Sequence, residues 1–284
     1  MSKTVHDIQE VLAEDLRNEH FASCEGLLQK LDPRVKLLGA ILLIIVAGWS
    51  RSIPALIFLA ILPVALMWAS SLPVWNLEKR IWGFIPLMTL LAAIPGIFSF
   101  FNPGLPILEV YHNPQGIAFW GLHISGPIYI SKQGIMAAMF LFLRVGVSLS
   151  IGSLLILTTP VARLLKSIRV LRVPVLLVMT IEMSYRYVIL LLGSSLEMYE
   201  ARKMRTVGSM SAKTQRELAG SSMAALFARS MALSEEVYQS MAARGYTGEA
   251  VSIDPLAWRK LDIISLTIII VLALVIVIGG AVFG

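Results

Sequence analysis

The chain has 284 residues, of which 57% are hydrophobic and only 15% are charged. Its mean hydropathy is +0.77, whereas soluble domains carry about 25% charged residues. A chain this apolar cannot cover a water-facing surface, which excludes a soluble enzyme and predicts an all-α integral membrane protein in a lipid bilayer. The net charge of +6 is interpreted as a topology signal and not as a nucleic-acid-binding surface. The single Cys24 fits neither an internal disulfide nor a metal site.

Residues 1–34 form a polar, cytoplasmic N-terminal segment without the apolar core of a signal peptide. A spanning helix needs about 20 mostly apolar residues. Four spans are predicted within residues 35–159 and a fifth within residues 261–284. Their apolar stretches are residues 37–49, 53–77, 81–101, 134–159 and 263–284. The first is the shortest, since residues 35–50 give only about 24 Å of helix.

The distribution of Lys and Arg orients these spans, because cytoplasmic loops are enriched in both. With a cytoplasmic N-terminus, Lys79 and Arg80 fall in an inner loop. Residues 102–133 then lie outside with Lys132 as their only basic residue, and residues 160–260 lie inside with 14 of the 24 Lys and Arg. This pattern predicts a multi-pass protein of a prokaryotic cell (inner) membrane.

Residues 160–260 are predicted to form cytoplasmic and interfacial coupling helices. Residues 174–192 are apolar but carry Glu182 and Arg186, and a charge at mid-membrane costs about 2.5–3.5 kcal/mol. We therefore expect this helix to lie in or under the inner face, with Glu182 and Arg186 paired at i, i+4. It should end near Gly208, and a second helix with apolar residues at helical spacing should end at Gly245. The alternative is that residues 174–192 cross the membrane.

Arg144 is a charge inside the fourth predicted span, and such a residue is a functional candidate. The alternative, which we favour, is a structural ion pair inside the bundle, with Glu182 as one possible partner. The nearby Gly146 and Gly152 are expected to allow close helix packing. His112 and His123 in the outer loop are interpreted as solvated histidines, so no metal ligand is predicted.

The chain contains no Walker A, HExxH, CxxC or GxSxG pattern, so no catalytic residue and no cofactor are predicted. Two tripeptides are more informative: Ala201-Arg202-Lys203 and Ala243-Arg244-Gly245, each near the end of an expected cytoplasmic helix. Arginine offers a planar fork of donors for carboxylates and carbonyls, and a small neighbour lets a partner backbone approach. Two such ends could dock two copies of one partner, although basic residues beside a membrane are also common.

Together with other short motifs, these residues resemble a known family. The motifs are Asp32-Pro33-Arg34 before the first span, Thr158-Thr159-Pro160 after the fourth, Tyr185-Arg186-Tyr187, and the two Ala-Arg tripeptides. Over residues 20 to 250 the chain is similar to the transmembrane T component of energy-coupling factor (ECF) transporters, most closely the cobalt/nickel-type CbiQ family.

The resemblance implies a non-catalytic subunit that couples two ABC-type ATPases to a separate membrane substrate-binding (S) subunit. Arg202 and Arg244 would dock into the ATPases, although Lys203 stands where the family often has a small residue. Cobalt or nickel uptake is the expected role, with metal recognition left to the partner subunit. A vitamin-type ECF importer is an alternative, and so is a self-sufficient secondary transporter, which would show inverted repeats and broken helices.

Overall fold

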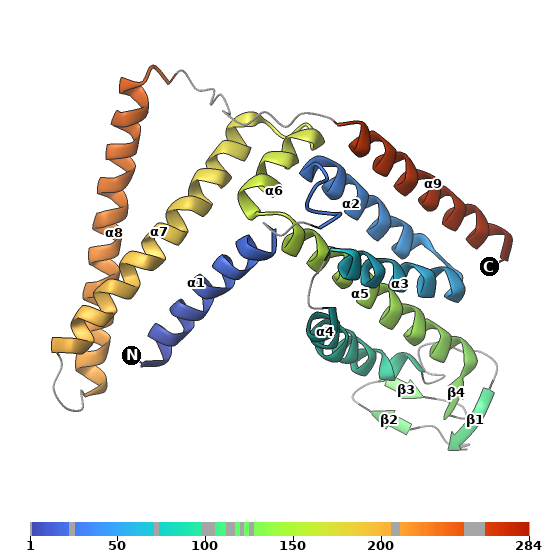
Figure 1. Cartoon of the computed structure of the whole chain (residues 1–284). Helices are drawn as coiled ribbons and strands as arrows, with labels where there is room; N and C mark the ends of the chain where they lie inside the picture. The colour runs from blue at the N-terminus through green and yellow to red at the C-terminus, as the bar shows by residue number, and fades with distance from the viewer. Residues whose placement is uncertain are drawn as a thin grey trace. The chain divides into compact units, whose positions relative to one another are not determined.

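The structure is a computed structural model that describes residues 2–22, 26–70, 74–97, 106–111, 117–119, 122–124, 128–205, 211–246 and 259–283. The chain divides into two units. One comprises Met1–Ser23 and Thr159–Ala257, and the other comprises Cys24–Thr158 and Trp258–Gly284. Figure 1 shows the helices that make up each of them.

The unit of residues 24–158 and 258–284 is a helical bundle. Its helices are α2 (Pro33–Trp49), α3 (Ile53–Ala69), α4 (Val74–Ile97), α5 (Lys132–Thr158) and α9 (Lys260–Phe283). Helix α5 packs against α2, α3 and α4, and α9 packs mainly against α2. Leu43, Ala47, Leu56, Val147 and Ala273 belong to the buried core between these helices. The predicted all-α membrane class is confirmed.

Helix α2 begins where the sequence carries two start signals. The Asp32 side chain accepts a hydrogen bond from the Arg34 backbone N–H at 2.8 Å, which is an N-cap bond. Pro33 occupies the first turn, where its missing N–H has no helical partner to lose. The Asp-Pro-Arg motif therefore starts the helix.

The predicted second span, residues 53–77, is too long. Helix α3 ends at Ala69 and α4 starts at Val74, directly after the sequence Ser-Ser-Leu-Pro at residues 70–73. Proline disfavours helical conformation in the residue before it and is tolerated just before a new helix. Lys79 and Arg80, expected in a loop, consequently lie in the first turns of α4, which continues through Pro86 and Pro95.

Four short strands interrupt the helices between α4 and α5. Strand β1 (Pro106–Tyr111) pairs antiparallel with β4 (Ile128–Ser131), and β2 (Ile117–Phe119) pairs antiparallel with β3 (Leu122–Ile124). From the sequence, only a loop was expected here. His123 lies opposite Ala118 in the β2–β3 register, while His112 lies outside the described residues.

The other unit contains α1 (Ser2–Ala22), α6 (Val161–Ser167), the 3-10 helix η1 (Ile168–Leu171), α7 (Val175–Arg205) and α8 (Ala212–Ala243). Helix α7 packs against α1, α6 and α8. Helix α1 was not predicted, and it is attached by two bonds: the Tyr185 hydroxyl donates to Asp15 Oδ1 at 2.5 Å and Gln9 Nε2 donates to Glu200 Oε1 at 3.2 Å. The predicted end of α7 near Gly208 lies outside the described residues.

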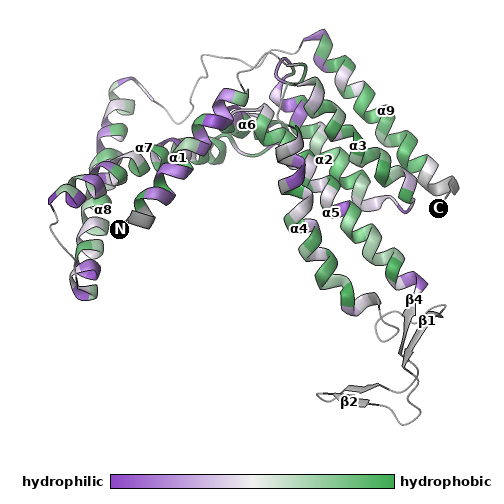
Figure 2. Ribbon diagram, turned by 60° about the horizontal axis from the view of Figure 1, so that its bottom comes forward, coloured by the Kyte–Doolittle hydropathy of each residue, from purple (hydrophilic) through white to green (hydrophobic). Residues whose placement is uncertain are grey.

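Three described helices are long and apolar enough to cross a membrane, namely Lys132–Thr158, Val175–Arg205 and Lys260–Gly279, and Ile53–Ala69 and Ile81–Gly96 are shorter apolar helices. Figure 2 shows hydrophobic residues along α3, α5 and α9, whereas α1 and α8 carry hydrophilic residues along their length. The protein is therefore a multi-pass membrane protein. The assignment of residues 1–34 and 160–260 to the cytoplasmic side, and of residues 35–159 and 261–284 to the spans, stays a prediction.

Candidate functional site

The first Ala-Arg motif lies on the last turns of α7, where its arginine holds α8. Arg202 Nη1 donates to the Leu218 carbonyl at 2.6 Å and to Ser221 Oγ at 3.2 Å, and it also contacts Ser222 Oγ. Ser222 is fully buried. Arg202 therefore fixes the contact between the end of α7 and the first half of α8, a role that the sequence analysis did not foresee. Its neighbour Lys203 is exposed.

The second motif forms the end of α8. Gly245 has φ +76°, its N–H donates to the Ala242 carbonyl at 3.0 Å, and the Tyr246 N–H donates to the Met241 carbonyl at 3.0 Å. This pair of bonds is a Schellman cap, in which glycine takes the left-handed position. The prediction that α8 ends at Gly245 is confirmed. Arg244 is the C-cap residue and is exposed together with Ala243.

The two motif arginines lie at separate points along α8: Arg202 of α7 contacts its first half, and Arg244 follows its last residue. Ser222, which contacts Arg202, is about 33 Å from Arg244 at 1.5 Å per residue of helix. Near that second end, the Tyr246 hydroxyl donates to Met179 Sδ at 3.0 Å, so the residues after α8 are held against the start of α7. Helices α7 and α8 thus run in opposite directions with a fixed contact at each end.

Between these contacts α8 presents an apolar stripe. Met223, Phe227, Met231 and Tyr238 are 68%, 68%, 59% and 68% exposed, and their spacing places them along one side of the helix. These are among the apolar residues whose helical spacing predicted this helix from the sequence. Large exposed apolar surface marks contact sites for proteins or membranes, and methionine adapts well to a partner.

The charged residues of α7 form a contact different from the expected one. Glu182 Oε1 lies 3.6 Å from Lys166 Nζ of α6, so among the described residues the carboxylate pairs with Lys166 and not with Arg186. Lys166 comes within reach of Glu182 because α6 packs against α7. Tyr185 of the Tyr-Arg-Tyr motif holds α1 through Asp15.

The Asp-Pro-Arg motif is tied to the last helix. The Asp32 N–H donates to Asp262 Oδ1 at 2.8 Å, and the Arg259 N–H donates to Asp262 Oδ2 at 2.8 Å. Asp262 is only 1% exposed, so one buried carboxylate joins the beginnings of α2 and α9. Asp262 was not predicted from the sequence, although an acidic residue in the first turn of a long apolar helix is a recognisable signal.

Arg144 and Lys36 each cap the end of a neighbouring helix. Arg144 Nη2 on α5 donates to the Ser50 carbonyl at the end of α2 at 2.7 Å. Lys36 Nζ on α2 donates to the Thr158 carbonyl at the end of α5 at 2.9 Å. A cation at a helix C-terminus is favoured by the helix dipole. The structural interpretation of Arg144 is supported, but its acceptor is a carbonyl and not the expected carboxylate.

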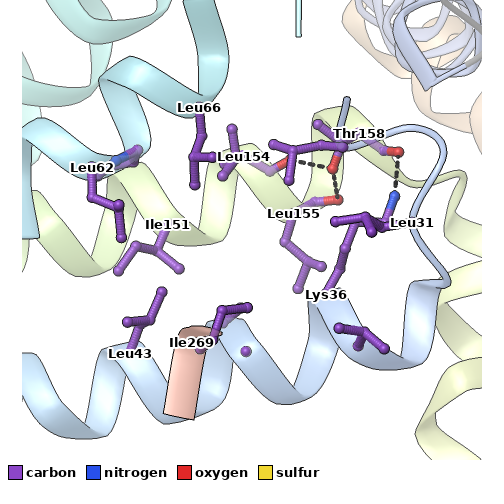
Figure 3. A pocket seen from close by; sticks show the side chains of 15 residues that line it. Leu31, Lys36, Leu43, Leu62, Leu66, Ile151, Leu154, Leu155, Thr158 and Ile269 are labelled. Atoms are coloured by element: carbon purple, nitrogen blue, oxygen red, sulfur yellow. Dashed lines mark hydrogen bonds between the residues drawn. The ribbon is translucent and has the colours of Figure 1, made fainter. Parts of the chain in front are cut away.

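Lys36 also lines an apolar cavity inside the bundle. Figure 3 shows Leu43, Leu62, Ile151 and Leu155 around this cavity, with the Lys36 ammonium bonded to Thr158 at one end. The described residues include no group of three or more His, Cys, Asp or Glu that could hold a metal ion.

Comparison with known proteins matches residues 25–253 to the family described as "Cobalt transport protein", CbiQ. An uncharacterized protein of Methanocaldococcus jannaschii is 30% identical over 87% of this chain and 80% of its own. The energy-coupling factor transporter transmembrane protein EcfT of Streptococcus thermophilus is 25% identical over 88% of this chain and 93% of its own. EcfT of Lacticaseibacillus paracasei is 25% identical over 77% and 80%.

The match covers the helices that carry both Ala-Arg motifs as well as the Asp-Pro-Arg motif. The chain therefore belongs to the CbiQ family, the transmembrane T components of ECF transporters.

Proposed function

We propose that this chain is the coupling subunit of an ECF-type ABC importer, linking two cytoplasmic ATPases to a membrane S subunit. The observation that carries the proposal is the exposed Arg244 at the glycine-capped end of α8, on the same helix that Arg202 holds about 33 Å away. The α7–α8 pair thus carries an arginine at each of two separate points, and each arginine could dock one of the two ATPases. ATP hydrolysis is then the work of the partners, and this chain transmits their movement.

The two arginines differ in what their removal should do. Arg244 is exposed at a helix end, so Arg244→Ala removes a docking group without touching the fold. Arg202 also bonds Leu218 and Ser222, so Arg202→Ala loosens α7 from α8 in addition to any loss of docking. Arg244→Ala is therefore the cleaner test.

The experiment is co-purification of the ATPases with the tagged chain, combined with ATP-dependent uptake in cells. A buried interface arginine contributes on the order of 2 kcal/mol or more, so Arg244→Ala should lower ATPase recovery by tenfold or more with unchanged helical content. The control Arg229→Ala removes an exposed arginine elsewhere on α8 and should recover ATPase normally. If the double variant Arg202→Ala/Arg244→Ala still recovers the ATPases and supports uptake normally, the proposal is refuted.

The apolar stripe of α8 is the proposed contact for the S subunit. Its methionine and aromatic side chains are exposed, and a second membrane protein would cover them. Replacing Met223 and Met231 with Gln should release the S subunit while the ATPases stay bound, which separates this contact from the arginine contacts.

Cobalt or nickel is the proposed substrate, because the matching family carries the description "Cobalt transport protein". Recognition of the ion is assigned to the S subunit, and no residue of this chain is proposed as a ligand. A vitamin-type importer is the alternative, since relatives named EcfT align with most of this chain. The ligand bound to the co-purified S subunit decides between them. Uptake by this chain alone in proteoliposomes would instead indicate a secondary transporter.

A further inference from the structure

An apolar groove runs between α2 and α9. It is lined by Ile41 and Ile45 from α2 and by Leu266, Ile270, Leu274 and Val277 from α9. Ile45, Ile270 and Leu274 are 61%, 41% and 54% exposed, so the groove is open along its length. From Leu266 to Val277 it extends about 17 Å along α9. Its walls offer no polar side chain that could bind a hydrophilic ligand.

The groove leads toward the end of the bundle where basic residues collect. Asp262 accepts bonds from the backbone N–H groups of residues 32 and 259, both at 2.8 Å, which brings these two chain segments together. Four basic residues lie within two positions of those N–H groups, namely Lys30, Arg34, Arg259 and Lys260. Lys30, Arg259 and Lys260 are exposed.

The two acidic residues of this cluster, Asp32 and Asp262, offset only part of the charge of its four basic residues. Asp32 and Asp262 are 8% and 1% exposed and accept bonds from backbone N–H groups. Arg34 Nε is buried without a hydrogen-bond partner among the described residues. This end of the bundle therefore carries an excess of positive charge, with three exposed basic residues, next to an apolar groove.

We propose that this groove binds one anionic phospholipid, with an acyl chain along α2 and α9 and the phosphate on Arg34, Arg259 and Lys260. Apolar walls match the acyl chain, and the cationic end matches a phosphodiester, for which arginine is well suited. Basic pockets between spanning helices on the cytoplasmic side bind lipid headgroups. This inference is independent of the proposed coupling function.

Native mass spectrometry of the delipidated full chain in detergent tests the site, with phosphatidylglycerol and phosphatidylcholine as the two probes. One phosphatidylglycerol should be retained with at least tenfold preference over phosphatidylcholine. Arg259→Gln/Lys260→Gln should weaken its binding on the order of tenfold, because each basic residue near an anionic headgroup contributes several-fold. The control Lys213→Gln/Arg216→Gln removes the same charge from exposed positions of α8 and should leave binding unchanged.

The groove is tested separately from the cluster. Leu274→Trp fills the groove and should lower lipid retention, whereas Val275→Trp places the same ring at a 64% exposed position that does not line the groove. Glycerol phosphate, which carries the charge without the chains, should not compete at equal concentration. Equal retention of both lipids, equal effects of the paired variants, or competition by glycerol phosphate would overturn the proposal. So would cross-linking of a Leu274 photoprobe to a partner protein in place of lipid.

Discussion

Asp262→Ala should destabilise the bundle through two backbone groups at once. Asp262 is 1% exposed and accepts the Asp32 and Arg259 N–H groups at 2.8 Å each. Truncation leaves the buried Asp32 N–H and the partly buried Arg259 N–H without an acceptor, and a buried donor in that state costs about 1–3 kcal/mol. We expect a loss of about 3 kcal/mol in the free energy of unfolding. Asp262→Asn keeps one carbonyl oxygen, so it should lose about half as much.

The assay is unfolding of the purified chain by SDS in mixed micelles, followed by far-ultraviolet circular dichroism. Thr267→Ala is the matched control on the same helix, because the Thr267 hydroxyl bonds only the Ile263 carbonyl and is exposed to the surroundings. It should change the free energy of unfolding by about 0.5 kcal/mol or less. If Asp262→Ala unfolds at the same SDS fraction as the unaltered chain, Asp262 does not join α2 to α9 and the reasoning is wrong.

Arg144→Met should cost about 1–3 kcal/mol of stability in the same assay, because the Ser50 carbonyl at the end of α2 loses its donor. Arg51→Gln, an exposed neighbour of Ser50, is its control, and an equal effect of both would contradict the capping role. Gly146→Ala should also destabilise by about 1–3 kcal/mol, because a Cβ there meets three atoms of the rigid Trp82 ring at 2.7–2.9 Å. Gly152→Ala meets nothing within 4 Å and should be neutral or stabilising by up to about 1 kcal/mol, so a loss of stability there would contradict the packing argument.

Hydropathy, together with capping residues, proline and glycine at helix ends, was sufficient to predict most of the helical bundle. Asp32 and Pro33 predict where α2 begins, and Gly245 predicts where α8 ends, because both are local backbone effects. The break after Ala69 was missed because no charged residue occurs between Ile53 and Leu77, so the absence of charge suggested one continuous span across the Ser-Ser-Leu-Pro sequence. Helix α1 was missed because its place depends on contacts with Tyr185 and Glu200, far away in the sequence.

The candidate site was predictable in its residues but not in their contacts. Short motifs identify Arg202 and Arg244, whereas the bonds of Arg202 to α8 depend on how two helices pack. The predicted partner of Glu182 was wrong for a similar reason: the i, i+4 spacing favours Arg186, but the packing of α6 against α7 brings Lys166 to the carboxylate. Long-range pairs such as Asp32 with Asp262 need the fold itself.

These long-range bonds also bear on whether α7 crosses the membrane. The Asp32–Asp262 bond places the starts of α2 and α9 together, and the Lys36–Thr158 bond places the end of α5 beside them. If these three helices span the membrane, the end of α5 and the start of α9 lie at the same membrane face. The segment between Thr158 and Lys260 must then cross the membrane an even number of times or not at all. A crossing by α7 would then require a return through α8, the other long helix described in that stretch.

Helix α8 is a poor candidate for that return crossing. It carries Lys213, Arg216, Glu217, Arg229, Glu235 and Glu236 and is not among the described helices apolar enough to span. Charges at mid-membrane cost about 2.5–3.5 kcal/mol each, so a crossing by α8 is strongly disfavoured and α7 is expected to stay on the inner side. A cysteine placed at Ser211, the N-cap of α8, in a chain with Cys24→Ser should react with an impermeant maleimide only after the cells are opened. Labelling in intact cells would place Ser211 outside and would contradict the expected position of α7 on the inner side.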